Sequence, residues 1–164
     1  MKTSLFLAGL AINALAPIAV SAPSHASTDC ESAVTDAGRK ISATGAQVFR
    51  VEESAISGYR LPESYRNSNP QELAISLGNI NTAIDANQAK KGENIMASPK
   101  FKLSVATSVL SACAQYKALT IKMWGTDWIS TYFKMPSGAI KEASCLPAGA
   151  SGGKDLMWGY QVCF

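Results

Sequence analysis

Two segments of the chain carry hydrophobic residues at helical spacing. Residues 29–41 repeat apolar side chains every three or four positions, which predicts an amphipathic helix. Residues 99–113 predict the main helix, because Ser98 is a candidate N-cap, Pro99 suits the first helical position and an apolar stripe follows. The two stripes consist of Cys30, Val34, Ala37 and Ile41, and of Phe101, Val105, Val109, Ala112 and Cys113.

The region between these helices is less regular. Residues 45–50 predict a short strand, and residues 57–71 are rich in turn-forming residues and predict a loop. Residues 72–78 fit both a strand, by alternation, and a helix that follows Asn69 and Pro70; we favour a strand. The polar residues 85–94 are expected to form an exposed segment.

After residue 113 the hydrophobic period changes from that of a helix to that of a strand. Residues 119–123 alternate, and Gly125-Thr126 predicts a type II′ hairpin turn before a strand over 127–135. Residues 135–139 predict a three-residue hairpin with a G1 bulge, which sets Phe133 opposite Lys141 and Thr131 opposite Ala143. A glycine-rich loop at 147–153 leads to a last strand over 157–164.

These elements predict an α+β fold. An antiparallel C-terminal β-meander of about four strands is expected to pack against the main helix at 99–113, with the N-terminal helix added to it. Such a meander would place Cys145 about 20 Å from Cys113, too far for a disulfide, whereas a fourth strand would return Cys163 to that end. The topology therefore predicts the disulfides Cys113–Cys163 and Cys30–Cys145.

The N-terminus and the cysteines indicate export. Residues 1–26 have the positive start, apolar stretch and small-residue end of a cleaved signal peptide, and the apolar stretch is too short to span a bilayer. Residues 27–164 then form a single secreted domain, periplasmic or extracellular. Its four cysteines contain no close C-x-x-C pair, so two structural disulfides are expected rather than a zinc or redox site.

Composition removes several classes of function. The chain carries 15 Lys and Arg against 12 Asp and Glu, and its single histidine, His25, lies in the predicted signal peptide. A domain without histidine cannot use a Ser-His-Asp or Cys-His mechanism. The charges form no basic patch for nucleic acid, and no motif for a cofactor or a metal is present, so none is expected.

All three tryptophans lie in the C-terminal third of the chain. Alternation along the strand places Trp128, Ser130 and Tyr132 on the same sheet face as Glu142. Aromatic rings beside hydroxyls and carboxylates suit the binding of an envelope glycan or an extracellular protein. The alternative is that these aromatics are covered and belong to the core. The candidate binding residues are Trp124, Asp127, Trp128, Tyr132 and Glu142.

Two other functions stay open. A carboxylate-dependent hydrolase, similar to a glycosidase, needs two acids in one cleft. A secreted inhibitor or effector would act through an exposed loop, at residues 57–71 or 85–94. The candidate acids of the hydrolase are Glu52, Glu53, Glu63, Asp127 and Glu142.

The C-terminal part of the chain resembles a group of small exported proteins of cyanobacteria. The resemblance covers residues 98–164 and includes Ser111-Ala112-Cys113, Thr126-Asp127-Trp128-Ile129, Met135-Pro136-Ser137-Gly138 and Trp158-Gly159-Tyr160-Gln161-Val162-Cys163. It implies an exported α+β domain. It implies no activity, because no function is assigned to that group.

Overall fold

The fold was analysed in a computed structural model that describes residues 25–78, 86–149, 152 and 154–163. The predicted signal peptide lies outside the described residues except for its last two positions, which begin the first helix. Among the described residues, no helix has the length and apolar character needed to cross a membrane. The helices are α1 (His25–Ala43), α2 (Ala86–Met96), α3 (Pro99–Ala112) and a 3₁₀ turn (Glu63–Tyr65). The strands are β1 (Val48–Ala55), β2 (Tyr59–Arg60), β3 (Gln71–Leu77), β4 (Tyr116–Met123), β5 (Ile129–Lys134), β6 (Ile140–Glu142), β7 (Ser144–Leu146), β8 (Leu156–Met157) and β9 (Tyr160–Val162).

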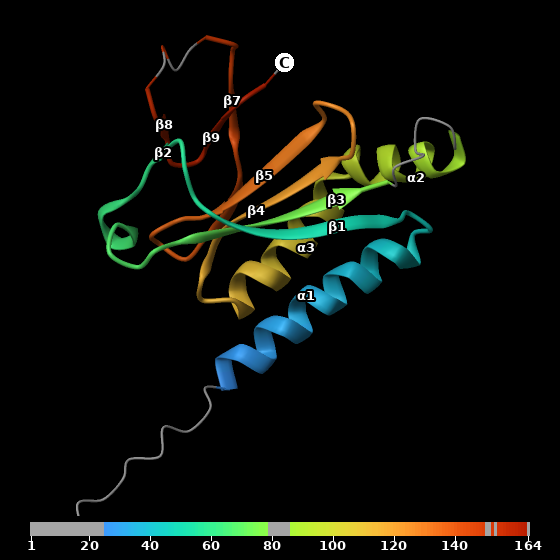
Figure 1. The fold of residues 1–164 in the computed structure, drawn as a ribbon, viewed down its shortest axis with the longest axis horizontal. Helices are drawn as coiled ribbons and strands as arrows, with labels where there is room; N and C mark the ends of the chain where they lie inside the picture. Colours follow the sequence, from blue (N-terminus) through green and yellow to red (C-terminus); the bar gives the residue numbers. More distant parts are fainter. Residues whose placement is uncertain (1–24, 79–85, 150–151, 153, 164) are drawn as a thin grey trace, which may run out of the picture.

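Five strands form one sheet in the order β1-β3-β4-β5-β6 (Figure 1). The ambiguous segment at 72–78 is a strand, as favoured, and it is β3 in the interior of this sheet. β3 runs parallel to β4, whereas the other neighbours are antiparallel. Parallel neighbours need a long crossover, and the chain between β3 and β4 includes α2 and α3. The polar segment predicted at 85–94 therefore contributes most of a helix, whose buried residues are Gly92, Ile95 and Met96.

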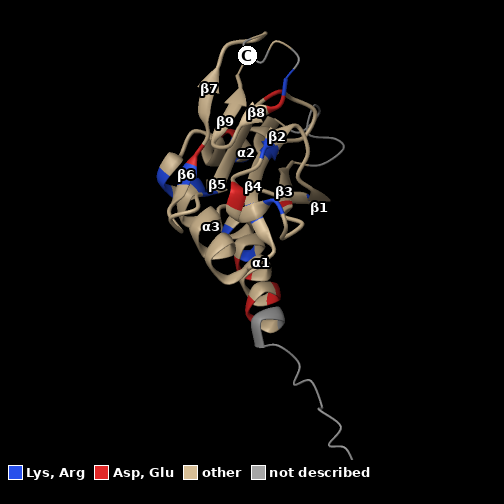
Figure 2. Cartoon of the chain, turned by 90° about the vertical axis from the view of Figure 1, so that its left-hand side faces the viewer, with Lys and Arg blue, Asp and Glu red and all other residues tan. Residues whose placement is uncertain are grey.

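The main core lies between the sheet and the helices α1 and α3. Inward residues of β3 and β4, such as Ile75 and Ile121, are buried against Val105 and Val109 of α3. The predicted helices are confirmed, although no side-chain hydrogen bond from Ser98 caps α3; its carbonyl accepts the Lys102 N–H at 3.1 Å. The α+β fold class is thus confirmed, with helices on one face of the sheet and the C-terminal segment on the other (Figure 2).

The predicted hairpins form with the expected registers. In the 135–139 hairpin, the Met135 N–H donates to the Ala139 carbonyl at 2.8 Å, and Gly138 has a φ of 83°. Phe133 faces Lys141 as predicted. The turn at Gly125 differs from the predicted type II′ turn, because a hydrogen bond from the Thr126 N–H to the Met123 carbonyl makes Gly125 the third residue of the turn.

The last strand does not enter the main sheet. β8 pairs with β2 and β9 pairs with β7, both in parallel, so the meander of the main sheet is β4-β5-β6. Trp158 explains this departure, because its ring packs into a second small core against Phe133, with ring centroids 4.6 Å apart. Tyr59 and Tyr65 complete this second core on the face opposite the helices, so the segment at residues 57–71 is attached to the body of the protein through these two rings.

The disulfide prediction was wrong in both pairs. Cys30 of α1 bonds to Cys113 at the end of α3, and Cys145 of β7 bonds to Cys163 after β9. The prediction assumed that the C-terminal strand lies in the main sheet, which would have returned Cys163 to Cys113. Because β9 instead pairs with β7, Cys163 lies beside Cys145, with their Cα atoms 5.4 Å apart.

The two bonds close chain loops of different length, which predicts different contributions to stability. Replacing Cys30 and Cys113 with Ala should lower the free energy of unfolding by about 4–5 kcal/mol, and replacing Cys145 and Cys163 by about 3 kcal/mol, because the longer loop restricts the unfolded chain more. Urea unfolding of the two double variants measures this difference. A larger loss from the C-terminal pair would contradict it.

Candidate functional site

A cleft of 1240 Å³ lies on the sheet face opposite the helices. Its floor comes from β1, β3, β4 and β5, and its far wall from the C-terminal segment around Cys145 and Cys163. Pockets for drug-sized ligands measure about 300–1,000 Å³, so this space suits an extended ligand. The lining residues are Glu52, Glu53, Ser54, Tyr59, Glu72, Ala74, Thr120, Lys122, Asp127, Trp128, Ile129, Ser130, Thr131, Glu142, Ala143, Cys145, Gln161, Val162 and Cys163.

The centre of the floor is a row of polar side chains across three strands. The Thr120 hydroxyl donates to the Glu72 carboxylate, and it lies 3.0 Å from the Thr131 hydroxyl. Tyr59 lines the cleft as well, and its burial, together with the charge of Glu72, raises the pKa of its phenol. The phenol is protonated at neutral pH, as an ordinary tyrosine is, and can donate a hydrogen bond.

A second carboxylate, Glu52, lies near Glu72 on the same face. In the β1–β3 register Glu52 faces Ala74 and Ser54 faces Glu72, so the two glutamates are diagonal neighbours. Diagonal neighbours have Cα atoms about 7–8 Å apart. Glu52 also contacts Arg50 at 3.1 Å and Lys122 at 3.9 Å, whereas the Glu72 carboxylate accepts a hydrogen bond from the neutral Thr120 hydroxyl.

The far wall is joined to the floor through Gln161 of β9. Its side-chain oxygen accepts the Thr131 N–H at 3.2 Å, and its side-chain nitrogen lies 3.5 Å from the sulfur of Cys163. The chain leaves the main sheet after β6, so Gln161 supplies a partner that a continued β6 would have given to Thr131. The same segment is anchored by Trp158, whose indole N–H donates to the Lys134 carbonyl at 3.1 Å.

Three of the predicted binding residues, Asp127, Trp128 and Glu142, line the cleft. Trp128 is 43% exposed, so its ring is accessible. Trp124 is not among the lining residues; it packs instead on Phe49, with ring centroids 4.6 Å apart. The structure thus brings one of the three tryptophans to the candidate site.

Tyr132 does not contribute to the predicted binding face, because it is fully buried under α3. Its burial, with the nearby Glu142 carboxylate adding to the effect, raises the pKa of its phenol well above the usual range. Of the residues expected on one face, Ser130 and Tyr132 of β5 and Glu142 of β6 do share it, and this is the face that packs against the helices. Trp128 precedes β5 and lines the cleft. For Tyr132, the alternative of a core aromatic is therefore the correct one.

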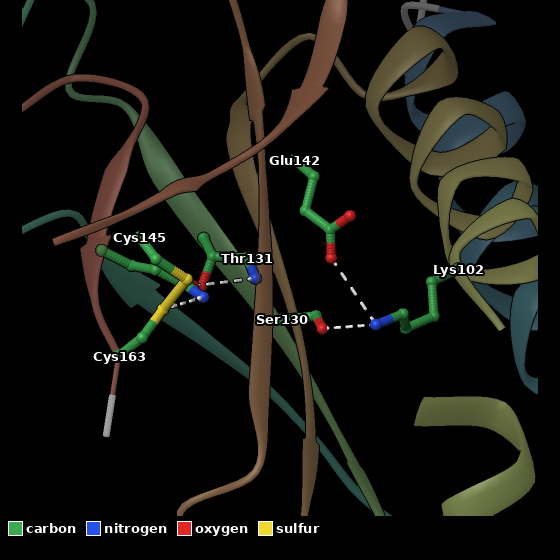
Figure 3. A network of polar contacts seen from close by, with 7 residues as sticks. Lys102, Ser130, Thr131, Glu142, Cys145 and Cys163 are labelled. Atoms are coloured by element: carbon green, nitrogen blue, oxygen red, sulfur yellow. Dashed lines mark hydrogen bonds and ion pairs between the residues drawn. A yellow bond between two sulfur atoms is a disulfide. The ribbon is translucent and has the colours of Figure 1, made fainter. Parts of the chain in front are cut away.

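Glu142 is engaged on the helix side of the sheet (Figure 3). The buried Lys102 of α3 donates to the Ser130 hydroxyl at 2.6 Å, and its Nζ lies 3.5 Å from the Glu142 carboxylate. Figure 3 shows this cluster and the Cys145–Cys163 bond on opposite sides of β5. The carboxylate therefore neutralises a buried ammonium group. Glu53 also points away from the floor, because it accepts the hydroxyl of the core residue Tyr116.

The sequence analysis missed Tyr59, Glu72, Thr120 and Gln161 as site residues. Glu72 and Thr120 alternate with apolar residues in β3 and β4, so alternation was a usable signal for an open polar face. What the pattern did not show was that β3 and β4 are neighbours. Glu63 was a candidate acid and is not among the lining residues.

Among the residues that the structure describes, no group of three His, Cys, Asp or Glu side chains could hold a metal ion. The cleft is lined by hydrogen-bonding and aromatic side chains, which are the kinds of group that bind organic ligands. Comparison with protein-family models, curated proteins and solved structures finds no match to this chain.

The Lys102–Glu142 pair predicts a coupled effect on stability. Glu142→Gln should lower the free energy of unfolding by about 1–3 kcal/mol, because the buried ammonium loses its counter-charge. Adding Lys102→Met should restore part of that loss, since it removes the charge and keeps the side-chain volume. Urea unfolding of the wild type, both single variants and the double variant measures the coupling.

The matched control is Lys100→Met, which removes an exposed lysine from the same helix and should change stability by less than about 0.5 kcal/mol. Simple additivity of Glu142→Gln and Lys102→Met would contradict the coupling.

Proposed function

We propose that this chain is an exported, non-catalytic binding domain that holds a neutral glycan in the cleft. The proposal rests on one observation: an accessible tryptophan, Trp128, stands at the edge of a large cleft whose floor consists of hydroxyls and carboxylates. Two disulfides fit a secreted protein, and the predicted signal peptide supports export to the periplasm or beyond.

The chemistry of the cleft suits a sugar. The exposed ring of Trp128 can stack on the apolar side of a sugar ring, and the Glu72 carboxylate at the cleft floor can accept hydrogen bonds from the sugar hydroxyls. The floor is held in place before a ligand arrives, because Glu72, Thr120 and Thr131 contact one another across three strands. Such preorganisation lowers the entropic cost of binding.

Charge narrows the class of glycan. The cleft is lined by more negative than positive side chains. Its acids include Glu52, Glu72 and Asp127, whereas its lysine is Lys122, which already contacts Glu52. A uronic acid or a sulfated sugar would meet an excess of like charge there, which disfavours binding. We therefore expect neutral oligosaccharides to bind more tightly than acidic ones of the same length.

Titration of the purified protein with neutral and uronic-acid oligosaccharides of matched length tests this proposal. Isothermal calorimetry should show binding of a neutral oligomer, and Trp128→Ala should weaken it about tenfold or more, because a stacking ring contributes of the order of 1 kcal/mol or more beyond its contact area. Trp124→Phe serves as the control, since Trp124 does not line the cleft. Absence of binding across a broad panel of envelope glycans would refute the proposal.

A second candidate function, a carboxylate-dependent glycoside hydrolase, is favoured by the placement of Glu52 and Glu72 as diagonal neighbours on the cleft floor. Glycosidases use two carboxyl groups about 5–5.5 Å apart or about 6.5–9.5 Å apart, depending on stereochemistry. In this hypothesis Glu72, beside neutral hydroxyls, would protonate the leaving oxygen, and Glu52, beside two cations, would act as base or nucleophile.

The release of new reducing ends from a bound oligosaccharide distinguishes the two functions. A hydrolase should release them, and Glu72→Gln should slow the release by about 10²-fold or more, because general acid catalysis is lost. Glu63→Gln is the matched control outside the cleft. Tight binding without any bond cleavage would exclude the hydrolase and leave the binding domain.

A further inference from the structure

The two disulfides lie in contrasting environments. Cys30 and Cys113 are 5% and 0% exposed and belong to the main core between α1, α3 and the sheet. Cys145 is exposed, Cys163 is half-buried, and both line the cleft. A thiol in solution needs access to a sulfur atom to attack it, so only the second bond is open to exchange in the folded protein.

The exposed bond joins the two parts of a segment that we name the C-terminal strap, which consists of the described residues 144–149 and 154–163. Cys145, Gln161, Val162 and Cys163 of the strap form the far wall of the cleft. Trp158 attaches the strap to the second core, where its side chain is buried and its indole N–H donates to the Lys134 carbonyl. Three residues further along, close to the disulfide, Gln161 joins the strap to Thr131 on the cleft floor. Within the strap, the short strands β7 and β9 pair with each other.

Around Gln161 and Cys163, the strap is held by the disulfide, the β7–β9 pair and the hydrogen bond between Gln161 and Thr131. β7 and β9 have three residues each and pair with each other, not with the main sheet. A pair of strands this short is not stable in isolation. Gln161 also lies 3.5 Å from the Cys163 sulfur, so the residue that fixes the wall to the floor depends directly on the position of the disulfide.

We propose that the Cys145–Cys163 disulfide is a redox-controlled clasp of the cleft, which a dithiol reductant opens without unfolding the domain. One thiolate of the reductant attacks a sulfur of the bond and forms a mixed disulfide, and its second thiol resolves that intermediate. The reductant leaves as a disulfide, and its two hydrogens end on Cys145 and Cys163 as thiols. The released strap then loses the Gln161 contact and the cleft loses its far wall.

The rest of the domain should keep its structure when the clasp opens. The Cys30–Cys113 bond is shielded from the reductant by its burial. Trp158 and its neighbours Tyr59, Tyr65 and Phe133 pack independently of the disulfide. The strap therefore stays attached at Trp158 and loosens only toward Gln161 and Cys163.

Graded reduction of the full secreted chain with dithiothreitol, followed by alkylation and peptide mass mapping, tests the clasp. Cys145 and Cys163 should be alkylated at reductant concentrations that leave Cys30 and Cys113 oxidised, while the circular dichroism of the domain stays unchanged. Hydrogen exchange should become faster at Thr131 and in β7 and β9, and not in α3. Equal reduction of both bonds, or unchanged exchange in the strap, would overturn the proposal.

The effect on the ligand rests on the proposed function and is measured separately. Neutral oligosaccharide should bind about tenfold more weakly to the selectively reduced protein, because the wall must be ordered again on binding. Reoxidation should restore the affinity, and Cys145→Ser/Cys163→Ser should bind weakly with or without dithiothreitol. If affinity is unchanged although the strap loosens, the clasp is refuted as a control of binding and the binding function stands. If no glycan binds in either state, the binding function is refuted, and mass mapping and hydrogen exchange alone decide the clasp.

Discussion

The parallel pairing of β3 with β4 is the constraint on which the rest of the fold depends. Two parallel neighbours cannot be joined by a tight turn, so the chain has to cross over the sheet between them. Here the crossover contains α2 and α3, and α3 brings Cys113 to Cys30 of α1. Both long helices therefore pack on one face of the sheet, and the opposite face is left to the C-terminal segment and the cleft.

Alternation along β3 and β4 divides the chemistry between the two faces. Leu73, Ile75 and Leu119 point to the helices and are almost completely buried. Their neighbours Glu72 and Thr120 point to the other face, where they meet across the parallel pair. The exception is β5, which places Ser130 on the helix face, where it accepts a hydrogen bond from Lys102. A buried polar group is stable there because each partner is satisfied by the other and by Glu142.

Local features were predictable from the sequence, and long-range pairings were not. Helical stripes, the alternation of β3 and the 135–139 hairpin depend on neighbouring residues, and all three were correctly predicted. Alternation reads the same for a parallel and an antiparallel strand, so the partner of β3 could not be derived from it. The disulfides failed for the same reason, because they depended on the assumed place of the last strand. Of the site, Asp127 and Trp128 stood out by composition, whereas Glu72 became visible only beside Thr120.

The open edge of the sheet also has a consequence for how copies of this protein meet. β1 is eight residues long and pairs on one side only, so its outer backbone groups form a template to which another strand could add. Three of the four residues at positions 50–53 of this strand are charged, namely Arg50, Glu52 and Glu53. A second strand would have to approach these charges. The opposite edge, β6, has only three residues. Charge at one edge of the sheet and the shortness of the strand at the other edge oppose edge-to-edge aggregation of folded copies of this domain.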